Sequence, residues 1–172
     1  MKRIIYILLI VGIFLSSCAF GNAKKWSLGD FNIYNSSGEV IDRPHPPYSG
    51  GVYYEHISLG STYCDDCRED HRQGLTHKGV AIGDNAIEAL SKYDLSGAYI
   101  RTGDYQSGIE WHELENLKKT VNENTKFFIF IWLDDNFNSV GRPTTDTSWK
   151  YVVSFLIRDN EIESYDGEIR GE

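Results

Sequence analysis

In the first half of the chain, four short runs are predicted to form strands, and two of them, residues 31–34 and 52–59, have the period of two that is typical of half-buried strands. A turn cluster, Asn35 to Gly38, separates the first two runs and predicts a hairpin between them. The proline-rich segment from Arg43 to Pro47 follows and predicts a semi-rigid linker. The strands predicted in this half comprise residues 31–34, 39–42, 52–59 and 76–82.

Helical spacing predicts two helices in the middle of the chain. Asp84 is a suitable N-cap for the first, which would run through Ile87 and Leu90 to Tyr93. The second is predicted to begin at Ser107, because residues 107–110 have the spacing of a capping box. Apolar residues then recur at helical intervals at Trp111, Leu114, Leu117 and Val121.

The C-terminal third has the strongest strand pattern. Residues 127–133 are all apolar, which predicts a central strand buried on both faces or nearly so. Residues 149–158 alternate, Asp159 and Asn160 can form a tight turn, and residues 161–165 can return along it. The chain is therefore predicted to be α+β, with an antiparallel C-terminal meander and about two helices packed on one face of the sheet.

The N-terminus has the pattern of an export signal. Lys2 and Arg3 precede an apolar run from Ile4 to Leu15, which is shorter than the roughly 20 residues that a spanning helix needs. The sequence Leu15-Ser16-Ser17-Cys18 that follows resembles the lipobox of bacterial lipoproteins. In that family the peptide is cut before the cysteine, which carries a diacylglycerol and usually an acylated (palmitate-type) amino group. An ordinary cleaved signal and an uncleaved anchor are the alternatives.

This resemblance divides the chain into a signal peptide at 1–17, a lipidated Cys18 with a tether to residue 25, and one extracytoplasmic domain at 26–172. It implies a location in the cell envelope. Ala19 rather than Asp after the cysteine favours the outer membrane or the cell surface if the source is Gram-negative, and the domain would then face the periplasm or the exterior.

Length and charge limit what the domain can bind. A chain of 172 residues suffices for one ordinary domain. The formal net charge is -8, and it becomes -10 once residues 1–17 are removed. An acidic domain repels nucleic acid and anionic lipid, so we expect no nucleic-acid partner and a membrane contact made only through the N-terminal lipid.

A second resemblance concerns residues 78–85 and the helix that follows them to Lys92 and Tyr93. A strand, a Gly-Asp pair and such a helix resemble small secreted domains of the SmpA/OmlA-like group and folds related to β-lactamase-inhibitor protein. In this chain Asp94 follows Tyr93, where those domains usually have Gly. The resemblance implies helices packed on an antiparallel sheet and a binding or inhibitory function.

Cys64, Cys67, His71 and His77 form the one chemical cluster of the sequence, and three interpretations remain open. The two cysteines can form a local disulfide, since they are the only thiols left if Cys18 is lipidated. All four residues together can hold zinc, although their spacing is shorter than usual. The Cys-x-x-Cys pair can also exchange thiols and disulfides, but the two Asp residues between the cysteines disfavour a thiolate.

No catalytic signature stands out, so the sequence favours a non-catalytic binding domain for a protein or another envelope component. No cofactor is predicted beyond the possible zinc. A metal- or thiol-dependent enzyme that uses the Cys–His cluster is the first alternative. An immunity or inhibitor lipoprotein directed against a secreted toxin is the second, because an acidic surface suits a basic target. Tyrosines in loop or strand segments, among them Tyr99, add a hint of a recognition surface.

Overall fold

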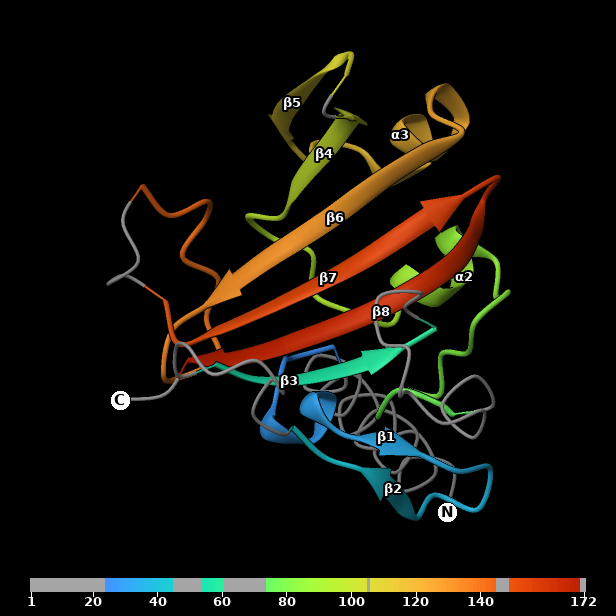
Figure 1. Cartoon of the computed structure of the whole chain (residues 1–172), viewed down its shortest axis with the longest axis vertical. Coiled ribbons are helices and arrows are strands. Elements are labelled where there is room, and N and C mark those ends of the chain that lie inside the picture. The colour runs from blue at the N-terminus through green and yellow to red at the C-terminus, as the bar shows by residue number, and fades with distance from the viewer. Residues whose placement is uncertain (1–23, 45–53, 61–73, 105, 145–148, 171–172) are drawn as a thin grey trace, which may run out of the picture.

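The computed structural model describes residues 24–44, 54–60, 74–104, 106–144 and 149–170 (Figure 1). Six strands form one antiparallel sheet: β3 Tyr54–Leu59, β4 Tyr99–Asp104, β5 Gly108–Glu113, β6 Lys126–Leu133, β7 Tyr151–Arg158 and β8 Glu161–Arg170. Their order across the sheet is β3-β8-β7-β6-β4-β5. The predicted α+β class and antiparallel sheet are confirmed.

The predicted meander is made by β6, β7 and β8, which pair antiparallel in sequence order. Asp159 and Asn160 form the tight turn between the last two strands with φ of 51° and 66°. Asp and Asn tolerate this left-handed conformation better than most residues. The register then aligns apolar residues across the three strands, with Ile129 opposite Phe155 and Phe155 opposite Tyr165.

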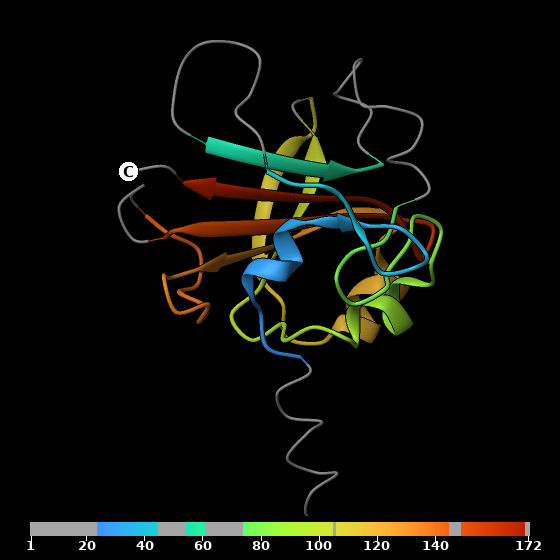
Figure 2. The ribbon, with the colours of Figure 1, turned by 90° about the horizontal axis from the view of Figure 1, so that it is seen from below.

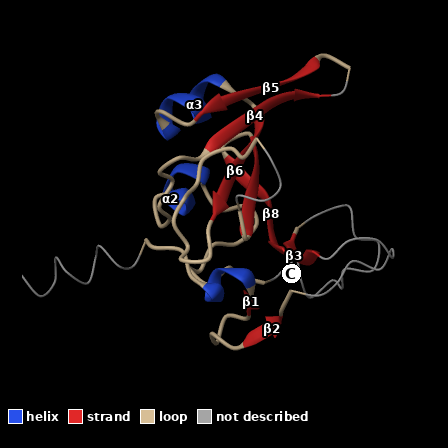
Figure 3. Ribbon diagram, turned by 90° about the vertical axis from the view of Figure 1, so that its left-hand side faces the viewer, coloured by secondary structure: helices blue, strands red, loops and turns tan. Residues whose placement is uncertain are grey.

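The helices lie on one side of this sheet, as predicted (Figures 2 and 3). They are the 3₁₀-helix η1 Leu28–Phe31 and the α-helices α2 Ala86–Leu90 and α3 Leu117–Glu123. We call the covered side of the sheet the inner face and the opposite side the outer face. A separate hairpin of β1 Ile33–Tyr34 and β2 Val40–Asp42 confirms the first predicted hairpin. The predicted strand at 52–59 corresponds to β3, within the part of it that is described.

The hydrophobic core fills the space between the inner face and the helices. Phe127, Ile129, Ile131 and Leu133 of β6 point into it and are buried, as are Phe155 of β7 and Tyr165 of β8. The prediction that residues 127–133 are buried on both faces or nearly so is confirmed, because all seven are buried or partly buried, Trp132 of the outer face included. Phe128 and Phe130, which alternate with the core residues, are partly exposed on the outer face.

The predicted helix from Ser107 is wrong over its first half. Residues 108–113 form β5, which pairs with β4 throughout, and the helix begins only at Leu117. Asn116 provides the cap, because its side-chain oxygen accepts a hydrogen bond from the Lys119 N–H at 3.0 Å. Gly103 and Gly108, with φ of 76° and 94°, shape the β4–β5 turn, and pairing with β4 overrides the local helical spacing.

The predicted strand at 76–82 is also wrong, since this segment is a pair of turns. Thr76 N–H and the Val80 carbonyl close one of them at 2.9 Å. Asp84 is not the N-cap of α2; its carboxylate accepts from Ala81 N–H at 2.9 Å and stabilises the preceding turn. Asn85 caps the helix by accepting from the N–H groups of Ile87 and Glu88. The helix ends at Leu90, before the expected Tyr93.

Candidate functional site

The outer face of β6 carries a ladder of aromatic rings. Phe128, Phe130 and Trp132 project from it at every second residue, as the strand period requires. The Trp132 residue is 9% exposed, and it does not belong to the hydrophobic core cluster of the inner face. The rings of Phe130 and Trp132 are nearly parallel, with centroids 5.5 Å apart, and Phe128 follows Phe130 at 6.0 Å.

Strand register brings two further residues to this ladder. Arg101 of β4 lies opposite Phe128 of β6 on one side and opposite Trp111 of β5 on the other. The Trp111 ring is inclined by 53° to Phe130 and by 46° to Trp132, with centroids 5.1 and 5.9 Å away. Trp111 therefore forms a corner with the ladder. The Tyr99 ring of β4 meets the Trp132 ring edge-on, with centroids 6.4 Å apart.

Two guanidinium groups lie over the rings. The Arg101 guanidinium carbon is 4.1 Å from the Phe128 centroid and 5.4 Å from that of Phe130. Arg142 lies 4.3 Å over Trp111. It comes from the loop after β6, which the hydrogen bond from Val140 N–H to the Trp132 carbonyl holds beside the strand at 2.9 Å. We call this surface the aromatic–arginine platform; it comprises Tyr99, Arg101, Trp111, Phe128, Phe130, Trp132 and Arg142.

The charges of the platform are not neutralised locally. Within the described part of the chain, Arg101 and Arg142 form no ion pair or hydrogen bond, whereas Arg158 pairs with Glu163 at 2.9 Å. A guanidinium stacked on a ring still presents its N–H edge to solvent. The platform therefore offers cationic donors supported by aromatic rings, which are groups that recognise a ligand rather than exchange protons with it.

The outer face changes character across the sheet. Phe130 lies opposite Ser154 of β7, which in turn lies opposite Asp166 of β8. The Asp166 carboxylate accepts hydrogen bonds from Ser58 at 2.7 Å and from Ser164 at 3.2 Å. On the half of the sheet that contains β8 and β3, this part of the outer face is thus polar, whereas β6, β4 and β5 carry the aromatic rings of the platform.

A buried ion pair lies on the other side of the sheet. The Asp30 side chain is fully buried, and its Oδ1 lies 3.9 Å from the Lys78 ammonium. Burial raises the pKa of Asp30, an effect that the Lys78 charge and hydrogen bonds from Ser27 oppose. Burial also lowers the pKa of Lys78. The Tyr165 hydroxyl donates to the Asp30 carbonyl.

Lys78 of this ion pair, together with Trp26, holds residues 24–26 against the domain. Lys78 donates to the carbonyls of Lys24 and Lys25 at 3.0 and 2.9 Å, and its ammonium lies 4.9 Å from the Tyr93 ring. Trp26 stacks on that same ring at 4.7 Å and donates from Nε1 to the Asp94 carbonyl at 2.7 Å. We interpret these contacts of Lys78 and Trp26 as structural, because they join residues of this chain to one another. Asp30 Oδ1 is buried and has no hydrogen-bond partner among the described residues.

Most residues of the predicted chemical site lie outside the described residues. Cys18, with the lipobox and signal peptide, and Cys64, Cys67 and His71 are among them. His77 is described, and its exposed ring packs against Tyr34 at 5.5 Å. In the described segments, no group of three or more His, Cys, Asp or Glu side chains is arranged to hold a metal ion.

A pocket of about 770 Å³ lies between the β4–β5 hairpin and α3. Glu110, Glu113 and Glu123 line it together with His112 and Lys119. His112 and Glu110 approach each other at 3.4 Å, and both side chains are largely exposed. Acidic side chains dominate this pocket, so it is unsuited to an anionic ligand.

Sequence reasoning missed the platform, although a signal was present. Within residues 127–133, the second, fourth and sixth positions are aromatic, whereas the alternate set is mainly aliphatic. Of the tyrosines that hinted at a recognition surface, Tyr99 belongs to the platform.

In comparisons with known proteins, the chain matches no protein-family model, no curated protein sequence and no solved structure. Among the described residues, no helix has the length and apolar character needed to cross a bilayer. A function for this chain must therefore be inferred from its own residues.

Proposed function

We propose that this chain is a membrane-anchored extracytoplasmic lipoprotein whose domain binds a protein or another component of the cell envelope without catalysing a reaction. The observation that supports binding is the aromatic–arginine platform. The observation that supports the anchor is the lipobox around Cys18.

The composition of the platform is that of a binding surface. The centres of interfaces are enriched in Trp, Tyr, Phe and Arg and depleted of Lys, Glu and Asp, and the platform contains only residues of the first group. Two exposed large hydrophobic residues belong to the same elements as platform residues. Ile109 lies on β5 with Trp111, and Val140 lies in the loop that contains Arg142; each is 39% exposed.

The position of the N-terminal segment is compatible with this proposal. Lys24, Lys25 and Trp26 are held on the side of the sheet that carries the helices, opposite the platform (Figure 2). A lipid attached at Cys18 would be connected to the domain through this segment. The lipid attachment and the platform would then lie on opposite sides of the sheet.

The anchor can be tested by metabolic labelling. We expect the protein to incorporate labelled palmitate and to be retained in the membrane fraction, and we expect the Cys18→Ala variant to lose both properties. Two or more acyl chains are needed for stable anchoring, so loss of the attachment site should release the domain. Unchanged processing and retention of Cys18→Ala would refute the anchor.

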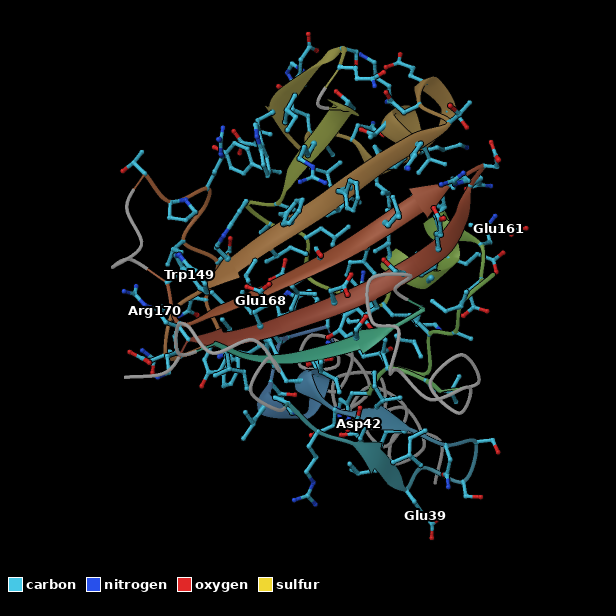
Figure 4. All side chains as sticks on the ribbon, in the orientation of Figure 1. Glu39, Asp42, Trp149, Glu161, Glu168 and Arg170 are labelled. Carbon is cyan, nitrogen blue, oxygen red and sulfur yellow. The ribbon has the colours of Figure 1, made fainter. Side chains whose placement is uncertain are left out.

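The binding function can be tested by affinity purification of the anchored protein from native envelopes, with two matched tryptophan variants. Trp111→Ala removes a platform ring that Arg142 covers. Trp149→Ala removes a ring over which Arg170 lies at 6.0 Å, next to the end of β8 and outside the platform (Figure 4). We expect Trp111→Ala to lose the partners that the unmodified protein and Trp149→Ala both recover. Equal recovery by both variants would contradict a platform-based function.

A further inference from the structure

Strand β5 forms an open edge of the six-stranded sheet. It is the last strand in the order of the sheet, and it pairs with β4 over all of its residues (Figures 1 and 3). No described strand lies beyond it, so half of its backbone N–H and C=O groups point away from the sheet. An edge of this kind is a template for pairing with a further strand.

The pairing with β4 shows which groups point outward. Leu114, the residue after β5, donates from its N–H to the Ala98 carbonyl of the segment before β4 at 2.8 Å. Because the direction of these groups alternates along a strand, the N–H and C=O groups of Ile109, Trp111 and Glu113 point to the open edge. β5 contains neither Lys nor Pro, and its register with β4 is regular, so three common devices that block an edge are missing from this strand.

A second copy of this chain fits the edge in one register. An antiparallel pair of identical strands has a two-fold axis, which is the symmetry of most homo-oligomers. With the axis at Trp111, Glu110 lies opposite His112 of the second copy, and His112 lies opposite Glu110 of that copy. Ile109 then lies opposite Glu113, so the outward-pointing backbone groups of β5 meet hydrogen-bonding partners.

The other registers lack this charge complementarity. An axis at Glu110 or at Glu113 would place identical carboxylates directly opposite each other, which is destabilising. An axis at His112 would place the two imidazoles opposite each other and would leave Glu110 without a basic residue directly across the interface. An axis at Ile109 would pair only the first three residues of β5. In a chain of net charge -8, two copies can approach best in a register that opposes no carboxylates.

The side chains at this edge are accessible to a second copy. Five of the six residues of β5 are exposed, and Trp111 is partly exposed. Glu110 and His112 approach each other at 3.4 Å within one copy, with 73% and 57% of their side chains exposed. Across the axis these two side chains would alternate with their counterparts, and an imidazole N–H can donate to a carboxylate of either copy.

We infer that β5 pairs antiparallel with β5 of a second copy about a two-fold axis at Trp111, which gives a dimer with one continuous sheet. The two Trp111 residues would be neighbours on the outer face, with Cα atoms roughly 5.5 Å apart. The platform of each copy would then receive a tryptophan from the other copy. The dimer does not depend on the identity of any ligand, so this inference goes beyond the proposed function.

The inference can be tested by the oligomeric state of the full chain in detergent, with micelles in excess over protein. Sedimentation equilibrium at increasing protein concentration measures the dissociation constant, and we expect a reversible dimer. Glu110→Lys and His112→Glu should each weaken the dimer by about tenfold, because each replaces both complementary pairs across the axis by pairs without opposite charges.

An equimolar mixture of these two variants is the decisive control. In a mixed dimer, the lysine introduced at position 110 lies opposite the glutamate introduced at position 112, and the remaining Glu110 lies opposite the remaining His112. Both pairs are then complementary again. We expect the mixture to form dimers about as tightly as the unmodified protein, which would also show that both variants are folded.

A substitution at Glu113 tests the backbone hydrogen bonds separately from the charges. Because the Glu113 N–H points outward, Glu113→Pro removes a donor from the open edge and leaves the pairing with β4 intact. Glu113→Thr is the matched variant, since it removes the charge and keeps the N–H. We expect Glu113→Pro to be monomeric and Glu113→Thr to form dimers at least as tightly as the unmodified protein.

Three results would overturn the inference. They are an unmodified chain that is monomeric at every concentration, a mixture of Glu110→Lys and His112→Glu that forms no dimer, and equal dimerisation of Glu113→Pro and Glu113→Thr. If the chain is monomeric and Glu113→Pro loses a protein partner in the affinity purification, the edge pairs with a strand of that protein instead. A monomeric chain whose Trp111→Ala variant still loses its partners refutes only the dimer and leaves the proposed function standing.

Discussion

The two faces of β6 are both apolar, yet they differ in what they contact. Ile129 and Ile131 point inward, are fully buried and pack with residues of other strands and helices. Phe128 and Phe130 point outward, keep part of their exposure and contact other rings and an arginine. Apolar character alone therefore does not identify the core of this domain. The inner set has the contacts that folding requires, whereas the outer set has contacts that a ligand can share.

The largest effect is expected from truncation on the inner face. Phe155→Ala should destabilise the domain by about 3–5 kcal/mol, because it leaves a cavity between Tyr93 and Tyr165, whose rings lie 5.2 and 5.1 Å away. Urea unfolding followed by circular dichroism measures the change in the free energy of unfolding. A loss no greater than that of an outer-face truncation would remove the distinction between the faces.

The next effect concerns the carboxyl group buried on the inner side. Burial raises the pKa of Asp30 above its ordinary value of 3.8, so the folded protein binds this proton more tightly than the unfolded chain. The stability it contributes is present below pH 3.8 and is lost as the pH rises through the raised pKa. The unfolding free energy of the unmodified protein relative to Asp30→Asn should therefore fall as pH rises.

Asp94→Asn is the matched control, because the stability that Asp94 contributes depends on pH in the opposite direction. Hydrogen bonds from Ser96 lower the pKa of Asp94 below 3.8, so its contribution is present above that pH and is lost as the pH falls through the lowered pKa. Urea unfolding of the three proteins between about pH 3 and 7 separates the two profiles. A pH profile of Asp30→Asn parallel to that of the unmodified protein would show that the Asp30 proton is not linked to folding.

A smaller loss of stability is expected on the outer face. Phe130→Ala removes a partly exposed ring and should cost about 1–2 kcal/mol, since cross-strand aromatic contacts are lost without a core cavity. The same unfolding measurement provides the comparison with Phe155→Ala. A cost of Phe130→Ala equal to that of Phe155→Ala would show that the outer ladder is part of the structural core.

The smallest effect is expected at Arg101. Its guanidinium has cation–π contacts and no ion pair within the described residues, so Arg101→Gln should lower the free energy of unfolding by at most about 1 kcal/mol. Thermal unfolding checks this, with Arg170→Gln as the matched variant. A severe destabilisation by Arg101→Gln alone would mean that the arginine is needed for folding.

The sequence predicts the meander well because its signals are local. Alternation in 149–158 and the Asp159–Asn160 turn determine the pairing of β7 with β8 without information from the rest of the chain. The prediction of a helix at the residues of β5 is wrong because their conformation depends on pairing with another strand. These residues are aligned by β4, and the spacing from Trp111 to Val121 combines a strand and a short helix that happen to keep one period.

The platform could be predicted only in part. The alternation of Phe128, Phe130 and Trp132 is visible in the sequence, but a run of seven apolar residues hides which set faces solvent. The contribution of Arg101 and Trp111 depends on the register of β4 between β6 and β5. Arg142 joins through a loop whose path is determined by a backbone hydrogen bond to Trp132. Such long-range placement has no local sequence signal.

The contacts that hold residues 24–26 against the domain also determine how it would carry a mechanical load. Tension along the N-terminal chain enters the fold where Lys78 holds the carbonyls of Lys24 and Lys25 and where Asp94 binds the Lys24 carbonyl and the Trp26 ring nitrogen. These contacts belong to the turn before α2 and the segment after it, not to the six-stranded sheet. A force applied at this end would break these contacts of Lys78 and Asp94 first, and the sheet would keep its shape while it holds a ligand.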